Sequence, residues 1–447
     1  MTTNHDNLAI RPIHYLGSKL RLLESIKAAV DSVDPTEGAI CDLFSGSGVV
    51  SEFMIQYRDV VSADIQKYSS ILSEAAIVKL PDLVDADQIV DDIKQSSTTI
   101  KLNRCFSNLL AYEEAGLDRL LNGQLNSSYE IIEKGSIYIY MNEPIPDISK
   151  ELSTVLADCI CEMEKAGLDS SVDTMITRYF GGLYFSYRQA VELDAIASYA
   201  FSKDSLLKTK LTAALLSTAS EIVNTVGKQF AQPLKVRTSK GELKPSLKEK
   251  IVHDRMLDTF SIFKDWLTYY IAAGTDEHSL STLCMDYKDV LSTLKSKQVK
   301  VVYADPPYTR YHYSRYYHVL ETICLRDNPS VTTTFPNGSG GISRAIYREG
   351  RHQSPFCIKS QAEQAFGQLF EGVRQLGVPL VLSYSPFDAA KAATPRLRSI
   401  DQLVEMASEY YNHVEIRSPG TFTHSKLNST EKNFEANHEA ELLIVCY

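Results

Sequence analysis

The chain has 447 residues, of which 44% are hydrophobic and 23% are charged, with a formal net charge of −10. This length and composition predict a globular protein with two or three domains. The longest apolar runs are far too short to cross a membrane, and the polar N-terminus lacks the apolar core of a signal peptide. We therefore expect a cytoplasmic protein with no membrane partner.

The cysteines do not indicate metal or disulfide chemistry. The eight cysteines form no CxxC pair and have no histidine at metal-ligand spacing. We expect reduced structural thiols and no metal site. The acidic net charge argues mildly against nucleic acid as a partner, but a local basic cluster can still bind it.

A helix is predicted near the N-terminus, where apolar residues recur at helical spacing from Leu22 to Val33. Ser18 is its expected N-cap. Gly17 and Lys19 would then lie at the helix N-terminus, where backbone N–H groups favour an anion. Lys19 is a candidate to clamp a carboxylate, and the alternative is a surface lysine in the first helical turn.

A glycine-rich turn follows the first predicted strand, residues 39 to 44. The stretch Asp42-Leu43-Phe44-Ser45-Gly46-Ser47-Gly48 leads directly into a second helical pattern. Glycines let the backbone pass close to a ligand, although the full GxGxxG pattern of dinucleotide sites is missing. The next short strand ends in Asp64, about 20 residues on, where an acidic side chain can hold ribose hydroxyls.

Helical patterns dominate from about residue 81 to residue 280, which we interpret as an insertion into an α/β domain. Its aromatic and glycine-rich stretch contains Arg178 and Tyr179, and a basic cluster follows. The candidate DNA contacts in that cluster are Lys228, Lys235, Arg237 and Lys240. Rings interleaved with Arg and Lys suit contacts to bases and phosphates. Core tyrosines beside a solvated basic loop would give the same pattern.

The α/β pattern resumes with a strand at residues 283 to 286 and another that begins at Val299. The second strand ends in Asp305-Pro306-Pro307-Tyr308, at the strand end where ligands bind in open α/β sheets. The prolines keep the backbone extended and carry no N–H, so the segment offers acceptors beside a planar ring. This arrangement suits a planar group bearing an amine, whereas a plain Pro-Pro turn is the alternative.

A Gly/Ser/Thr-rich loop at residues 327 to 355 carries three further candidate DNA contacts, Arg344, Arg348 and Arg351. Loops of this length in compact domains are usually functional or disordered. Two more strands are predicted at residues 378 to 385 and 440 to 446. Between them, the polar residues 423 to 426 form a loop that could face a substrate.

These motifs, in this order, resemble the Dam-like class of adenine-specific DNA methyltransferases. The matching stretches are Tyr15-Leu16-Gly17-Ser18-Lys19, the Asp42 to Gly48 turn, Asp64, an insertion, Asp286 and Asp305-Pro306-Pro307-Tyr308. The resemblance implies a doubly wound, mostly parallel α/β sheet with an antiparallel last strand. It further implies a catalytic domain over residues 11–80 and 281–447, interrupted by a mainly helical DNA target-recognition domain over residues 81–280.

The resemblance also implies S-adenosylmethionine as the cofactor and double-stranded DNA as the partner. The cofactor-binding residues would be Tyr15, Gly17, Lys19, Asp42, Phe44, Gly46, Gly48, Asp64, Asp286 and Asp305. The catalytic residues would be Asp305, Pro306, Pro307 and Tyr308. Asp305 and the Pro306 carbonyl would accept the hydrogens of the target amine, and Tyr308 would stack on a flipped-out adenine.

Other functions stay open from the sequence alone. Enzymes that methylate the cytosine amine share the constellation but more often carry Ser in place of Asp305, and RNA is a further substrate class. A nucleotide-dependent oxidoreductase is disfavoured by the incomplete glycine fingerprint. A non-catalytic DNA-binding module with a relic cofactor pocket is a further alternative. No motif reveals the recognition sequence, the oligomeric state or a cognate restriction enzyme.

Overall fold

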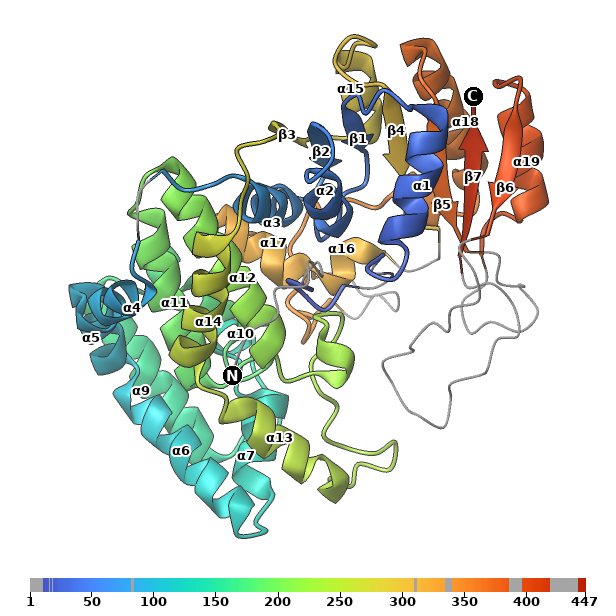
Figure 1. Cartoon of the computed structure of the whole chain (residues 1–447). Helices are drawn as coiled ribbons and strands as arrows, with labels where there is room; N and C mark the ends of the chain where they lie inside the picture. Colours follow the sequence, from blue (N-terminus) through green and yellow to red (C-terminus); the bar gives the residue numbers. More distant parts are fainter. Residues whose placement is uncertain are drawn as a thin grey trace. The chain divides into compact units, whose positions relative to one another are not determined.

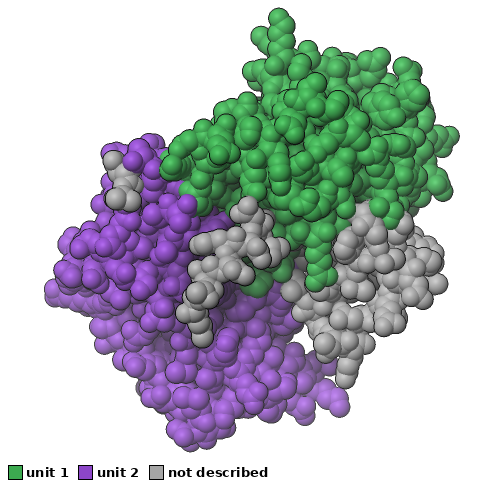
Figure 2. All heavy atoms as spheres, viewed as in Figure 1, with its two compact units in different colours: residues 1–79, 273–314, 352–447 green, residues 80–272, 315–351 purple. Residues whose placement is uncertain are grey.

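The computed structural model describes residues 11–15, 17, 19–81, 84–308, 312–333, 340–385, 396–418 and 441–447. The chain divides into two compact units. Unit 1 comprises residues 1–79, 273–314 and 352–447, and unit 2 comprises residues 80–272 and 315–351 (Figure 2). Each unit is therefore built from segments that are distant in the sequence.

Unit 1 contains a seven-stranded sheet with the order β3-β2-β1-β4-β5-β7-β6 (Figure 1). Its strands are β1 (Ile40–Asp42), β2 (Val60–Asp64), β3 (Leu280–Cys284), β4 (Val301–Ala304), β5 (Leu380–Tyr384), β6 (Val414–Arg417) and β7 (Leu442–Cys446). Strands β1 to β5 run parallel, and β7 pairs antiparallel with both β5 and β6. The predicted doubly wound, mostly parallel sheet with an antiparallel last strand is confirmed.

Helices cover both faces of this sheet, because successive strand residues point to opposite faces. The α-helices of unit 1 are α1 (Leu23–Val33), α2 (Val49–Met54), α3 (Lys67–Ile77), α15 (Tyr287–Thr293), α18 (Ala362–Leu376) and α19 (Ile400–Ser408). In β4, Val301 and Tyr303 pack in one core with α1 and α2. Val302 and Ala304 pack in the other core with α15, α18 and α19. The strand is thus buried on both sides and its end is rigidly placed.

Unit 2 is mainly helical. Its α-helices are α4 (Ala86–Gln95), α5 (Ser97–Cys105), α6 (Ser107–Leu121), α7 (Asn126–Lys134), α8 (Ile137–Asn142), α9 (Lys150–Ala166), α10 (Met175–Phe180), α11 (Tyr187–Phe201), α12 (Ser205–Ile222), α13 (Lys248–Arg255), α14 (Thr259–Ala272) and α17 (His318–Leu325), and α16 (Tyr313–Tyr316) crosses the sequence boundary between the units. Ser186 and Gln189 form a capping box at α11, which fixes where that helix begins. The helical content expected of the insertion is observed.

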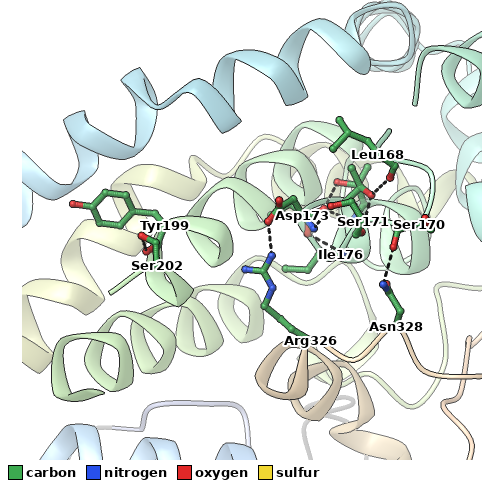
Figure 3. A network of polar contacts seen from close by, with 12 residues as sticks. Leu168, Ser170, Ser171, Asp173, Ile176, Tyr199, Ser202, Arg326 and Asn328 are labelled. Carbon is green, nitrogen blue, oxygen red and sulfur yellow. Dashed lines mark hydrogen bonds and ion pairs between the residues drawn. The ribbon is translucent and has the colours of Figure 1, made fainter. Parts of the chain in front are cut away.

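Residues 315–351 pack within unit 2, although the sequence places them after the DPPY strand. Arg326 pairs with Asp173 at 2.6 Å, and Asn328 donates to the Ser170 carbonyl at 2.9 Å (Figure 3). These contacts connect the end of α17 to the segment before α10. The compact helical unit is therefore larger than the predicted recognition domain.

The observed strands differ from the predicted ones mainly at their ends. The strand expected at residues 283–286 is β3, which ends at Cys284, and Asp286 instead caps α15. Strand β6 was not predicted. Its sequence Val-Glu-Ile-Arg alternates apolar and charged residues over only four positions, the shortest run that can indicate a strand.

Helix α1 begins at Leu23, and Leu22 at its N-cap position makes no side-chain cap. An N-cap at Ser18 would start the helix earlier, so that prediction of the helix start is wrong. Ser18 itself lies outside the described residues, as does the loop predicted at residues 423–426.

Candidate active site

A cavity in unit 1 lies at the carboxyl ends of the central parallel strands. In open α/β sheets, ligands bind where the strand order reverses, which here is between β1 and β4. The predicted catalytic and cofactor-binding residues that line this cavity are Tyr15, Lys19, Phe44, Asp64, Asp286, Asp305, Pro306, Pro307 and Tyr308. Side chains that are far apart in the sequence are thus brought together at one site.

The turn after β1 requires glycine at two positions. Gly46 and Gly48 have positive φ angles of 54° and 81°, which residues with side chains rarely adopt. A Cβ atom at Gly46 would lie 2.6 Å from the Tyr15 hydroxyl oxygen, and one at Gly48 would lie 2.7 Å from Oγ of Ser73. The turn therefore has no room for larger residues.

Two acidic side chains stabilise this turn. Asp64 accepts hydrogen bonds from the backbone N–H groups of Gly46 at 3.0 Å and Gln66 at 2.8 Å. Asp42, which is 1% exposed, accepts one from the Ser51 hydroxyl at 2.7 Å. Burial raises the pKa of both carboxyls, that of Asp42 to about 7. Asp42 therefore supports the turn from within the core.

Aromatic rings border the cavity near Asp286. The ring centroid of Phe44 lies 5.6 Å from that of Tyr287 and 5.5 Å from that of Phe356. Asp286 is the N-cap of α15, where its carboxylate accepts a backbone hydrogen bond. His352 also lines the cavity, and burial lowers its pKa although the Asp286 charge opposes this. This end of the cavity can enclose a planar, apolar group.

Lys19 lies between two carboxylates at the other end of the cavity. Its ammonium nitrogen is 2.8 Å from Oδ2 of Asp305 and 3.2 Å from Oε1 of Glu441, and it donates to the Gly17 carbonyl at 3.2 Å. Burial opposes the charge, but the two carboxylates raise the pKa of Lys19 well above its usual value. Protein groups already neutralise this ammonium, whereas the family resemblance implies a cofactor carboxylate as its partner.

Asp305 is half-buried, with a side chain that is 18% exposed. Burial raises the pKa of its carboxyl to about 6, Lys19 opposes that shift, and the Glu441 charge adds to it. The Lys19 ammonium at 2.8 Å favours the ionised carboxylate, which is an acceptor of hydrogen bonds.

Tyr308 is 7% exposed and has partners for both its ring and its hydroxyl. Its ring centroid lies 4.8 Å from that of Tyr384, and the Arg396 guanidinium lies over the ring at 4.8 Å. Its hydroxyl donates to Oε1 of Glu441 at 3.2 Å. Besides the predicted base stacking by its ring, Tyr308 thus binds Glu441 through its hydroxyl.

Glu441 is a charged residue at this site that the sequence analysis does not single out. It is 2% exposed and directly precedes β7. Besides Lys19 and Tyr308, Ser383 in β5 donates to it at 2.9 Å. An acidic residue bordering a fully apolar strand was the available signal, since buried carboxylates are rare unless they are paired.

The predicted DNA contacts in the first part of unit 2 have internal partners. Arg178 and Tyr179 are buried, and the Tyr179 hydroxyl donates to the Pro329 carbonyl at 3.0 Å. Lys228 pairs with the buried Asp254 at 2.9 Å. These side chains have structural roles within the helical unit.

Lys235, Arg237 and Lys240 are exposed and lie on a short hairpin. An antiparallel bridge between Arg237 and Leu243 closes this hairpin. Arg237 pairs with Glu133 at 2.8 Å. The hairpin therefore presents the exposed part of the basic cluster.

The three arginines from the long loop belong to unit 2 and have partners within it. Arg344 donates to the Ile132 carbonyl at 2.8 Å, and Arg348 pairs with Asp327 at 2.6 Å. The Arg351 guanidinium lies over the ring of Tyr347 at 4.5 Å. Each guanidinium thus has a partner within the unit.

The order and direction of the strands are consistent with the α/β methyltransferase fold. The sequence model of the D12 class N6 adenine-specific DNA methyltransferase matches residues 15–141 and 251–336. Over these residues the chain is similar to this family of DNA methyltransferases.

Three curated relatives agree with this assignment. Modification methylase LlaI of Lactococcus lactis subsp. lactis is 24% identical over 438 residues, which cover 95% of this chain and 56% of that protein. Type II methyltransferase M.FokI of Planomicrobium okeanokoites is 22% identical over 367 residues, covering 80% and 42%. Type II methyltransferase M.NlaIII of Neisseria lactamica is 26% identical over 87 residues, covering 19% and 26%. The chain thus spans at most 56% of the length of these relatives.

No solved structure matched the chain significantly. Among the described residues, no helix is both long and apolar enough to cross a membrane.

Proposed function

We propose that the chain transfers a methyl group from S-adenosylmethionine to the exocyclic amine of an adenine flipped out of double-stranded DNA. The observation that carries this proposal is the anionic acceptor Asp305, held by Lys19 beside Tyr308 in the cavity of a methyltransferase fold. Similarity to the family of N6 adenine-specific DNA methyltransferases supports the same reaction.

The residues around the cavity fit S-adenosylmethionine. The glycine turn packs closely against Tyr15, which lines the cavity, and we assign the backbone of this turn to the methionine part of the cofactor. Asp64 and Asp286 offer carboxylates for the ribose and for the adenine amine, and Phe44 offers a planar contact for the adenine ring. When bound, the cofactor supplies an electrophilic methyl group.

The chain's own residues make the amine reactive. The lone pair of an adenine amine is delocalised into the ring, so the nitrogen is a weak nucleophile. The Asp305 carboxylate and the Pro306 carbonyl accept hydrogen bonds from its two N–H groups, which favours a tetrahedral nitrogen with a free lone pair. The same oxygens stabilise the positive charge that develops on the nitrogen during transfer.

Base flipping requires binding energy from elsewhere in the protein. Unstacking and unpairing cost roughly a few kcal/mol, and one aromatic stack returns about 1–3 kcal/mol. We assign the remainder to phosphate contacts, with Lys235 and Lys240 on the exposed hairpin as the first candidates. Target recognition by the helical unit is part of this proposal.

Nucleoside analysis tests the reaction. The purified chain is incubated with S-adenosylmethionine and unmethylated plasmid DNA, and the DNA is digested to nucleosides for mass spectrometry. We expect N6-methyladenine that increases with enzyme and time. Methylated cytosine, or methylation of matched RNA alone, would refute the proposed substrate. Cofactor binding without any transfer would favour a non-catalytic DNA-binding module.

We further infer a cognate restriction enzyme as a functional partner. The support is that relatives are named modification methylase or type II methyltransferase. Single-molecule sequencing of DNA from cells that express the chain would give the modified sequence context. A single fixed context that a neighbouring nuclease cleaves only when unmethylated is the expected result.

A further inference from the structure

Glu441 joins three elements of unit 1 through a single oxygen atom. Its Oε1 receives the Lys19 ammonium at 3.2 Å, the Tyr308 hydroxyl at 3.2 Å and the Ser383 hydroxyl at 2.9 Å. These donors come from the segment before α1, from the DPPY strand end and from β5. One carboxylate at the start of β7 thus holds parts of the chain that lie hundreds of residues apart.

Burial of the Glu441 carboxylate has a free-energy cost. Glu441 is 2% exposed, and burying a charge is costly unless donors satisfy it. A core-filling role would be met at lower cost by an apolar side chain. The three donors instead include both a predicted catalytic residue, Tyr308, and the cation that contacts Asp305.

We propose that Glu441 is a positioning residue, which holds Lys19 against Asp305 and at the same time orients the Tyr308 hydroxyl. This inference rests on the proposed adenine methylation. Glu441 touches Lys19 and Tyr308, and through them it sets both the place and the charge of the acceptor.

The charge of Glu441 has a predictable effect on Asp305. Lys19 before α1 and Glu441 before β7 are the charged groups that shift the pKa of Asp305. The Asp305 charge in turn acts on the other titratable groups that face it, which are Asp42 at the end of β1, Tyr303 in β4, Tyr308 and Tyr313. The negative charge of Glu441 raises the pKa of Asp305, whereas Lys19 lowers it. Removing that charge must therefore lower the pKa, so that the carboxylate persists at more acidic pH.

The main test is Glu441→Gln, which keeps the shape and an acceptor but removes the charge. The pH dependence of kcat for adenine methylation is measured beside a titration of Asp305 by ¹³C NMR, with selectively labelled aspartate and Asp305→Asn for assignment. We expect the acid limb and the Asp305 titration to move to lower pH by about one unit. We also expect the plateau kcat to fall by about 10-fold to 100-fold, because a shift of about 1 Å in the reacting groups costs this much.

Asp34→Asn is the matched control, since Asp34 is another buried carboxylate of unit 1 that pairs with Arg58 at 2.9 Å. It should lower the thermal midpoint without moving the Asp305 titration. If Glu441→Gln behaves in the same way, Glu441 is only structural and the inference is overturned.

Glu441→Asp provides a second variant if Glu441→Gln does not fold. It keeps the charge but shortens the reach by one methylene, so kcat should fall while the Asp305 titration stays near the wild type. Wild-type kcat in this variant would overturn the positioning role. The NMR titration needs no substrate, so it tests the effect of Glu441 on Asp305 separately from the methylation assay. A wild-type chain that methylates no adenine would refute the proposed function, whereas an Asp305 titration that Glu441→Gln leaves unchanged would overturn the inference about Glu441.

Discussion

At the scale of single residues, the acceptor and the ring of the DPPY segment have separable tasks. In the proposed reaction, Asp305 and Pro306 supply oxygen atoms to an amine, whereas Tyr308 supplies a ring surface and a hydroxyl. The structure anchors these groups to the rest of the sheet through Lys19 and Glu441. Substitutions can therefore distinguish an acceptor from a stacking platform.

Replacing Asp305 by Ala removes the anionic acceptor. We expect methyl transfer to fall below detection, because the amine nitrogen then keeps its planar, delocalised form. Affinity for S-adenosylmethionine, measured by calorimetry, should stay within about tenfold of the wild type, which is about 1.4 kcal/mol. Near-normal turnover by this variant would contradict the mechanism.

Replacing Tyr308 by Phe keeps the ring and removes the hydroxyl donor to Glu441. Glu441 retains Lys19 and Ser383 as donors, so we expect kcat to fall by no more than about tenfold, in line with one lost hydrogen bond. Tyr308→Ala also loses the stack, worth about 1–3 kcal/mol, and the packing on Tyr384. Single-turnover methylation rates on a duplex that carries the target adenine compare the two variants, and equal rates would exclude stacking.

At the scale of elements, the glycine turn links the sheet to the cofactor end of the cavity. Gly46 adopts a left-handed conformation and its Cα faces the ring of Tyr15. Its N–H also donates to Asp64. A side chain at this position must displace the aromatic ring or the turn.

We predict that Gly46→Ala weakens S-adenosylmethionine binding by at least about tenfold, because left-handed backbone costs about 1–2 kcal/mol and the new Cβ clashes with Tyr15. Gly377→Ala is the matched control, since it has a positive φ of 75° in unit 1 but no atom within 4 Å of an added Cβ. Calorimetric titration should show normal cofactor affinity for the control. Equal losses in the two variants would mean that backbone strain alone is responsible.

Sequence patterns were sufficient where chemistry and local periodicity coincide. The turn at Gly46 and Gly48 and the strand ending at Asp305 follow from glycine conformation, proline geometry and apolar runs. Glu441 does not, because its partners Lys19 and Ser383 are distant in the sequence and only the closed sheet brings them together. Arg178 shows the reverse case: an arginine among aromatic residues suggests nucleic acid, yet it is buried and donates to Asn328 at 2.7 Å.

At the scale of the whole molecule, a net charge of −10 must be reconciled with the proposed binding to DNA, a polyanion. Local cations can dominate over net charge, since the screening length is about 8 Å at physiological salt. The exposed hairpin with Lys235 and Lys240 supplies such cations. DNA affinity should therefore depend on a few side chains and fall steeply with salt.

We predict that the double variant Lys235→Gln, Lys240→Gln reduces the slope of log affinity against log salt by about 2, because each lost phosphate contact contributes about 0.9. Lys150→Gln with Lys165→Gln, two exposed lysines of α9, is the control with the same change in net charge. Fluorescence anisotropy between 50 and 200 mM salt, roughly the range over which such contacts are felt, measures both. Equal slopes in the two double variants would place the DNA contacts elsewhere.

The interrupted layout of unit 2 has a consequence for protein engineering. Arg326 and Asn328 contact Asp173 and Ser170 from beyond the DPPY strand (Figure 3). In a chimera of two relatives that exchanges residues 80–272 alone, residues 315–351 of one protein would therefore have to pack against helices of the other. On the proposed role of the helical unit in target recognition, exchange of target preference requires two further crossovers, so that residues 315–351 are transferred together with residues 80–272.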